Sequence, residues 1–239
     1  MAEAPWRSLG RTLFGIFGVV TLIAVTLSFL GRESLAVDEQ SSSAPLGQVE
    51  LQALASQSTL RIAARSCETV VRGSGFVVDG VLVTNRHVVD GVASVKVDQP
   101  IRPAIVDLLA VSPTHDIAIL EAPEAIPLQW APVAASRGDQ VTVSGHAGGG
   151  PVATESGVVA GRVDGAAYGL TGEVLLLDVI TSGGYSGGPV LNDRGAVVAV
   201  LQGFDQATGL TLAVPADVAV SELSRSVDAG KFDSAVCGS

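Results

Sequence analysis

Short apolar runs separated by turn residues dominate the chain between residues 70 and 214. Valine, leucine and isoleucine fill these runs, and β-branched side chains favour strands. No stretch with a helical period separates them, and closed barrels are the usual way to protect so many strand edges. The pattern therefore predicts an all-β fold. The expected strands lie in 75–84, 92–97, 104–111, 116–120, 140–145, 153–163, 173–180, 196–203 and 209–215, with a further apolar strand from Val190.

The runs fall into two groups, divided by the segment 122–132 with its three prolines. In the first group, Asp79-Gly80 supplies the two-residue turn of a hairpin over 75–84. We expect two small barrels side by side, at about 67–125 and 135–215. A helix at about 215–228 follows, because Pro215 suits a first helical turn.

The N-terminal region carries an uncharged apolar run over residues 13–30. At about 1.5 Å per residue it reaches roughly 27 Å, near the lower limit for crossing a bilayer. Basic residues precede the run and mostly acidic ones follow it. The positive-inside rule thus predicts a cytoplasmic N-terminus at 1–12, a single-pass anchor at 13–30 and export of the remainder, periplasmic or extracellular.

An alternative for the same run is a signal peptide cleaved after Ala36, because Ser34 and Ala36 are small residues at the required spacing. The run is longer than usual for a signal peptide, which favours the anchor. Residues 31–60 form a linker in this interpretation, with a short helix near 49–55, and 61–239 form the globular domain.

Composition narrows the partners. The net charge is −10 and charged residues make up only 16% of the chain. Nucleic-acid binding needs clustered lysine and arginine, and no such cluster is present in the sequence. An acidic chain also binds anionic lipid poorly, so we expect the membrane attachment to be hydrophobic, through residues 13–30.

The chain contains two cysteines, Cys67 and Cys237. In an oxidising compartment they favour one disulfide, which would fasten the C-terminal tail to the start of the domain. Two separate buried thiols are the alternative. No histidine, cysteine or acidic spacing indicates a metal site, and no cofactor is expected.

Three short stretches carry candidate chemistry: His87 after a strand, Asp116 at the start of a strand, and Ser186 within a glycine-rich turn. A serine hydroxyl needs a base to take its proton, imidazole is a suitable base, and a buried carboxylate orients the imidazole. The order His-Asp-Ser is that of chymotrypsin-type double barrels. The glycines beside Ser186 suit an oxyanion hole built from the N–H groups of Gly184 and Ser186.

The segments TNRHVV (84–89), HDIAIL (115–120) and GYSGGPV (184–190) resemble the signature segments of trypsin-like serine proteases, especially bacterial ones. The resemblance runs from about Cys67 to Cys237 and implies two six-stranded antiparallel barrels of the chymotrypsin-like kind. It implies His87 as general base, Asp116 as its orienting partner, Ser186 as nucleophile, and Gly184 with Ser186 as the oxyanion hole.

Further features are similar to the membrane-anchored periplasmic acid-resistance proteases of the MarP type. They are GSGFVV (73–78), the glycine-rich SGHAGGGPVAT (144–154), a cysteine at each end of the domain and the N-terminal anchor.

Two positions of the resemblance bear on function, Tyr185 on activation and Ile180 on substrate specificity. Tyr185 replaces the family's usual Asp or Asn before the nucleophile, which predicts activity without a freed N-terminus.

The family's spacing places the base of the primary specificity pocket near Ile180, opposite Leu212, Ala213 and Val214. No acid lies there, so we expect small or medium apolar substrate side chains rather than Arg or Lys.

The sequence thus predicts a membrane-anchored, extracytoplasmic serine endopeptidase that hydrolyses protein or peptide substrates through an acyl-enzyme. Two alternatives remain: a non-catalytic binding module with a protease fold, and a protease that acts mainly on its own linker.

Overall fold

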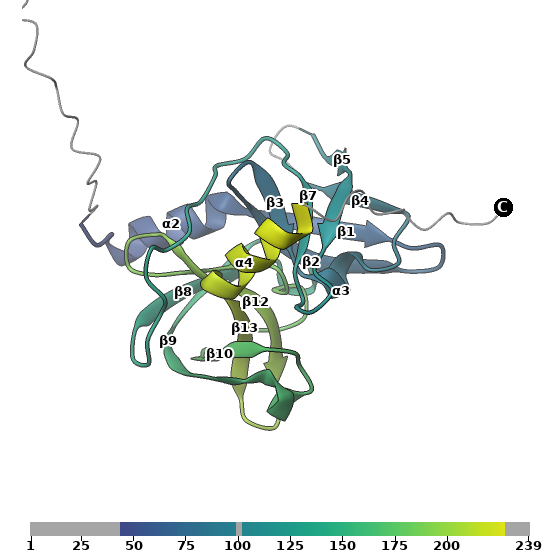
Figure 1. Cartoon of the computed structure of the whole chain (residues 1–239). Coiled ribbons are helices and arrows are strands. Elements are labelled where there is room, and N and C mark those ends of the chain that lie inside the picture. The colour runs from purple at the N-terminus through teal and green to yellow at the C-terminus, as the bar shows by residue number, and fades with distance from the viewer. Residues whose placement is uncertain (1–43, 99–101, 228–239) are drawn as a thin grey trace, which may run out of the picture. The chain divides into compact units, whose positions relative to one another are not determined.

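The structure, a computed structural model, describes residues 44–98 and 102–227 (Figure 1). The predicted anchor at 13–30 and Cys237 lie outside these ranges. Within them, no helix is both long and apolar enough to cross a membrane. The described chain forms two antiparallel β-structures and ends in a helix, which confirms the all-β chymotrypsin-like fold.

The first β-structure has the strand order β5-β4-β1-β2-β3-β7-β6. Its edge strands β5 and β6 are separated only by Asp107, so one bent segment pairs with β4 at one end and with β7 at the other. The barrel predicted with six strands is therefore present, with one strand divided in two. The bounds are β1 (Thr59–Arg65), β2 (Val70–Val78), β3 (Val81–Thr84), β4 (Ser94–Val97), β5 (Ala104–Val106), β6 (Leu108–Val111) and β7 (Ala118–Glu121).

Strand β1 is absent from the sequence prediction, which starts this barrel at about residue 67. In the structure β1 lies between β2 and β4 and pairs with both. Its sequence, TLRIAAR, contains two arginines and two alanines and lacks a strong strand signal. Pairing with two neighbouring strands and the burial of Ile62 stabilise β1 although its local sequence favours a strand only weakly.

The hairpin of β2 and β3 forms as predicted. Asp79 and Gly80 at its turn both have positive φ, 50° and 77°, the backbone that right-twisted hairpins require. The hairpin places Thr84 at the end of β3, next to the site described below.

The second β-structure is a closed six-stranded barrel with the order β10-β13-β12-β11-β8-β9. Two short 3₁₀ helices lie in the connections between its strands. They are η1 (Ala147–Gly149), between β8 and β9, and η2 (Gly165–Tyr168), between β9 and β10. The strands are β8 (Gln140–Gly145), β9 (Ala153–Asp164), β10 (Glu173–Asp178), β11 (Pro189–Leu191), β12 (Val197–Asp205) and β13 (Leu210–Pro215).

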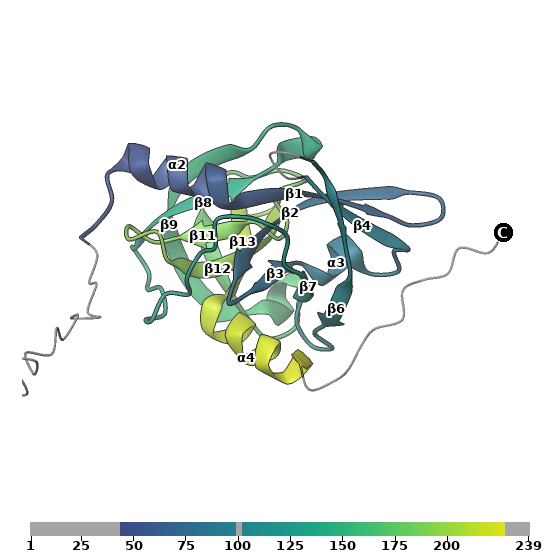
Figure 2. The ribbon, with the colours of Figure 1, turned by 90° about the horizontal axis from the view of Figure 1, so that it is seen from above.

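Two longer helices flank the barrels, and Figure 2 shows them on different sides. Helix α2 (Gln48–Ser58) arises from the segment assigned to the linker, but Leu51 and Ala55 are buried in a core cluster with residues of both barrels. Helix α4 (Ala216–Val227) confirms the predicted C-terminal helix and packs against β6, β12 and β13. It therefore contacts both barrels.

Candidate active site

His87 and Asp116 are brought together by two neighbouring strands. His87 lies in the short helix α3 (Arg86–Val89) after β3, and Asp116 lies just before β7. Strands β3 and β7 pair with Thr84 opposite Ala118. The carboxylate oxygen Oδ2 of Asp116 is 2.6 Å from Nδ1 of His87, and Oδ1 accepts the backbone N–H of His87 at 2.9 Å.

The turn before α3 also holds Asp116 by its backbone. The amide Nδ2 of buried Asn85 donates to the Asp116 carbonyl oxygen at 2.8 Å. A carboxylate at Nδ1 favours the tautomer with its hydrogen on that nitrogen and leaves Nε2 available as a base. The Asp116 side chain is 15% exposed and the His87 side chain 48% exposed, so the imidazole remains accessible to substrate.

Ser186 lies on the tight turn that leads into β11. Its carbonyl oxygen accepts the N–H of Ser74 at 2.8 Å, and its hydroxyl donates to the carbonyl oxygen of Gln202 at 3.0 Å. Among the described residues, no hydrogen bond joins the Ser186 hydroxyl to His87. Gln202 nevertheless lines the same cavity as His87 and Asp116. The structure thus places His87 and Asp116 on one cavity, and the Ser186 hydroxyl is turned toward β12, where it bonds to a residue that lines this cavity.

Gly184 has φ of 100°, and a Cβ there would lie 2.2 Å from the carbonyl oxygen of His146, so no side chain fits. The carbonyl of Gly183 accepts the N–H of Gly148 at 2.7 Å. In a trans peptide the C=O and N–H point in opposite directions, so the Gly184 N–H faces away from the glycine-rich loop. Within the described ranges, the N–H groups of Gly184 and Ser186 donate to no protein acceptor.

Ser74 is a site residue that sequence analysis missed, although it lies in the quoted segment GSGFVV. It is fully buried, and besides its N–H contact with Ser186 its hydroxyl donates to the Gly184 carbonyl at 2.7 Å. The same hydroxyl accepts the N–H of His146 at 2.9 Å, and the Ser74 carbonyl accepts the Thr84 hydroxyl. Ser74 therefore connects β2 to Gly184 and Ser186, on the turn that carries the candidate nucleophile.

A cavity of about 540 Å³ opens beside His87 and Asp116. Of the four residues predicted for the specificity pocket, Leu212 and Val214 line it, whereas Ile180 and Ala213 do not. The Ile180 side chain is 77% exposed, and Ala213 faces the core of the second barrel. Alternation along β13 separates Ala213 from its neighbours. Phe204 was not predicted and lines the cavity as well.

Tyr185 points into the second barrel rather than toward the cavity. It is 5% exposed and belongs to the barrel's core cluster. Its Cα and ring lie so close to Gly145 that a Cβ there would approach to 2.6 Å. Burial, and to a lesser degree the charge of Glu155, raises the pKa of the Tyr185 hydroxyl. Packing in the core of the second barrel therefore accounts for a tyrosine at this position.

His146 lies beside the turn that carries Ser186, with its carbonyl next to Gly184. Its Nδ1 is 2.9 Å from the carbonyl oxygen of Gly150. Over residues 44–98 and 102–227, no group of three histidine, cysteine or acidic side chains is placed to hold a metal ion. The predicted partner of Cys67, Cys237, is outside these ranges, so the disulfide stays a prediction.

Comparison with known proteins defines the class. Residues 73–200 match the family model of the trypsin-like peptidase domain, and the chain therefore belongs to this family. Its curated relatives include the putative serine protease HhoA of Synechocystis, 32% identical over 161 residues, which are 62% of this chain and 41% of HhoA. The mitochondrial serine protease HTRA2 of Bos taurus is 33% identical over 163 residues, 62% of this chain and 34% of HTRA2.

Among solved structures, the Rv3671c protease of M. tuberculosis in its active form has 25% identity and a TM-score of 0.69. The match covers 80% of this chain and 90% of that chain. Rv3671c is a MarP protease, so the resemblance to that group is confirmed. The chain spans less than half the length of the curated relatives it matches.

Proposed function

We propose that this protein is a serine endopeptidase of the trypsin-like class, with Ser186 as nucleophile, His87 as general base and Asp116 as the orienting carboxylate. The observation that carries the proposal is the double contact between Asp116 and His87, at Nδ1 and at the backbone N–H. A carboxylate of low exposure that holds an accessible imidazole beside a cavity is the arrangement that activates a serine hydroxyl.

In the proposed reaction the Ser186 hydroxyl rotates about its Cα–Cβ bond from Gln202 toward His87. This rotation would be a change between staggered χ1 wells. Nε2 of His87 takes the proton as the oxygen attacks the peptide carbonyl, and the imidazolium then protonates the departing amine. Water, activated by the same imidazole, releases the acyl group from Ser186.

The N–H groups of Gly184 and Ser186 would stabilise the oxyanion of the tetrahedral intermediate. Their lack of protein acceptors among the described residues supports this role, because preorganised donors act without reorganisation during the reaction.

The cavity supports a preference for apolar substrate side chains over Arg or Lys. Leu212, Val214 and Phe204 supply the apolar part of its wall, which does not compensate the desolvation of a cation. The carboxylates that also line the cavity, Asp90 and Asp116, already lie beside Arg86 and His87.

We further propose that the domain acts outside the cytoplasmic membrane, anchored through residues 13–30 and closed by a disulfide between Cys67 and Cys237. The charge asymmetry around the apolar run and the restriction of stable disulfides to oxidising compartments support this location. A cleaved signal peptide would give the same compartment without the anchor.

Fluorophosphonate labelling of the purified full chain tests the assignment. The wild-type protein should be labelled and Ser186→Ala should not, while Ser182→Ala on the same turn should retain labelling. Wild-type protein that is folded and unlabelled would instead support a non-catalytic binding module. Comparison of fragment sizes between wild type and Ser186→Ala would reveal cleavage within the linker.

A further inference from the structure

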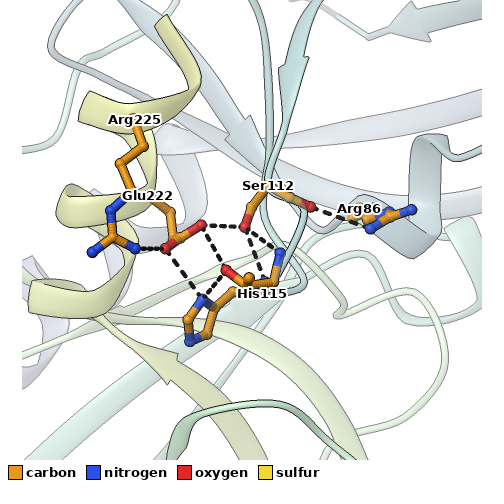
Figure 3. Close-up of polar contacts among 6 residues, drawn as sticks. Arg86, Ser112, His115, Glu222 and Arg225 are labelled. Atoms are coloured by element: carbon orange, nitrogen blue, oxygen red, sulfur yellow. Dashed lines mark hydrogen bonds and ion pairs between the residues drawn. The ribbon is translucent and has the colours of Figure 1, made fainter. Parts of the chain in front are cut away.

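A buried carboxylate lies on helix α4, in a cluster next to the proposed catalytic residues but not one of them. Glu222 is 1% exposed and is surrounded by side chains of one loop and by Arg225 of its own helix (Figure 3). Its Oε2 accepts the hydroxyls of Ser112, in a short hydrogen bond, and of Thr114 at 3.1 Å. Its Oε1 accepts the Arg225 guanidinium at 2.7 Å and lies 3.4 Å from Nδ1 of His115.

The hydrogens in this cluster are largely determined by its geometry. The Thr114 hydroxyl has one hydrogen and directs it to Glu222, yet its oxygen is also 3.0 Å from Nδ1 of His115. That contact therefore requires the hydrogen on Nδ1 of His115. The imidazole then donates to the Thr114 oxygen, and its Nδ1 lies 3.4 Å from the carboxylate that accepts both hydroxyls.

Burial would favour the neutral acid, because a charge without partners is costly in the interior. The hydrogen bonds from Ser112 and Thr114 and the charges of His115 and Arg225 outweigh burial and lower the pKa of the Glu222 carboxyl. A buried group with this many partners is held firmly, and it holds those partners in turn.

The loop held by Glu222 is the one that carries Asp116. Within it, the Ser112 hydroxyl also accepts the backbone N–H groups of Thr114 and His115. The next residue is Asp116 itself. On the other side, the Arg86 guanidinium donates to the Ser112 carbonyl at 3.3 Å, and Arg86 immediately precedes His87. The cluster therefore adjoins both members of the His87–Asp116 pair.

His115 is also confined by the second barrel. A Cβ on Gly172 would lie 2.2 Å from Nε2 of His115, so the chain between β9 and β10 packs directly on the imidazole. Arg86, Thr114 and His115 line the same cavity as the catalytic pair. Helix α4 therefore contacts, through Glu222, the loop that forms part of the cavity wall.

We propose that Glu222 is a positioning residue: from helix α4 it fixes the Ser112–Asp116 loop and thereby the orientation of the catalytic carboxylate toward His87. The proposal rests on the assignment of Asp116 and His87 to the triad. It makes the C-terminal helix part of the catalytic apparatus rather than only a cover for the barrels.

The test compares Glu222→Gln with Asp217→Asn in the full chain. Both substitutions replace a carboxylate of α4 by its amide. Asp217 is paired with Arg162 of the second barrel, not with the loop. We expect Glu222→Gln to lower the fluorophosphonate labelling rate and kcat about tenfold, the effect of losing roughly one hydrogen bond's energy, with little change in KM. Asp217→Asn should retain wild-type rates.

A second measurement does not depend on activity. The proton between Nδ1 of His87 and Asp116 should give a downfield NMR resonance that is absent from Asp116→Asn. In Glu222→Gln this resonance should shift or broaden, and in Asp217→Asn it should not. If Glu222→Gln does not accumulate as folded protein, Ser112→Ala replaces it in the test, because it removes the Glu222 partner at the shortest distance. The labelling rate, kcat and the resonance should then change in Ser112→Ala as expected for Glu222→Gln.

Unchanged labelling, kcat and resonance in folded Glu222→Gln would overturn the inference, as would equal losses in both variants. Failure of the wild-type protein to react would contradict the proposed function instead. The resonance would still decide whether Glu222 orients the His87–Asp116 pair.

Discussion

The hydroxyl of Ser74 donates a hydrogen bond of 2.7 Å to the carbonyl oxygen of Gly184, although 110 residues separate them in the chain. The contact joins a strand of the first barrel to the turn of the second barrel that carries Ser186. Because the N–H of Ser74 also bonds to the carbonyl oxygen of Ser186, a single buried serine fixes the Gly184–Tyr185 and Ser186–Gly187 peptides. The turn that carries the proposed oxyanion hole is thus held from the opposite barrel.

Ser74→Ala should lower kcat about tenfold, because the Gly184 carbonyl loses its partner and the turn can reorient. The same change leaves the His146 N–H without an acceptor, so the free energy of unfolding should fall by about 1–3 kcal/mol. Steady-state kinetics and urea unfolding measure the two effects.

Ser58→Ala is a matched control for this substitution. Ser58 is equally buried, but its hydroxyl has no hydrogen-bond partner in the described chain. Its replacement should leave kcat unchanged. Equal kinetic effects at both positions would show that Ser74 has no specific role in the turn.

Asp116→Asn should reduce kcat by about 10⁴, if the pair behaves as in the general serine-protease mechanism. The amide keeps the shape but favours the wrong imidazole tautomer for accepting the serine proton. The exposed carboxylate of Asp178 in β10 provides a control, since Asp178→Asn should retain activity. A loss of only a few-fold in Asp116→Asn would remove Asp116 from the proposed mechanism.

Acid should selectively remove the stabilisation that Glu222 provides. Its pKa in the folded protein is lowered, since the hydrogen bonds and neighbouring charges outweigh burial. The contribution is therefore fully present above the unfolded-state pKa of about 4.3 and is lost as pH falls through the lower folded value. Urea unfolding from about pH 3 to 7 should show the difference between wild type and Glu222→Gln shrinking below about pH 4.3. A difference that is constant with pH would contradict this role for the charge.

Ile180→Asp should not create a preference for Arg or Lys, because Ile180 is 77% exposed and does not line the cavity.

Leu212→Ala should lower kcat/KM for apolar substrates about tenfold, since it removes part of the cavity wall. Profiling with a peptide library measures both. Efficient cleavage after Arg by Ile180→Asp would restore Ile180 to the base of the pocket.

Sequence by itself determined the all-β class, the hairpin at Asp79-Gly80, the position of helix α4 and the three candidate catalytic residues. Each depends on a local signal: strand-forming runs, a turn dipeptide that tolerates positive φ, a proline at a helix start, or residues of known chemistry in an informative order. The segment of α2 also carried a helical signal, but its burial did not follow from its polar composition.

Only the tertiary structure decided which residues surround the site. Strand β1 has a weak local pattern and exists because β2 and β4 bond to both of its edges. Ile180 follows the family's spacing but points outward, and Tyr185 points inward, because the backbone of the turn sets both directions. Ser74 and Glu222 contact the site across 110 residues each. Such contacts depend on how two barrels and a helix pack together, and no local sequence pattern specifies that packing.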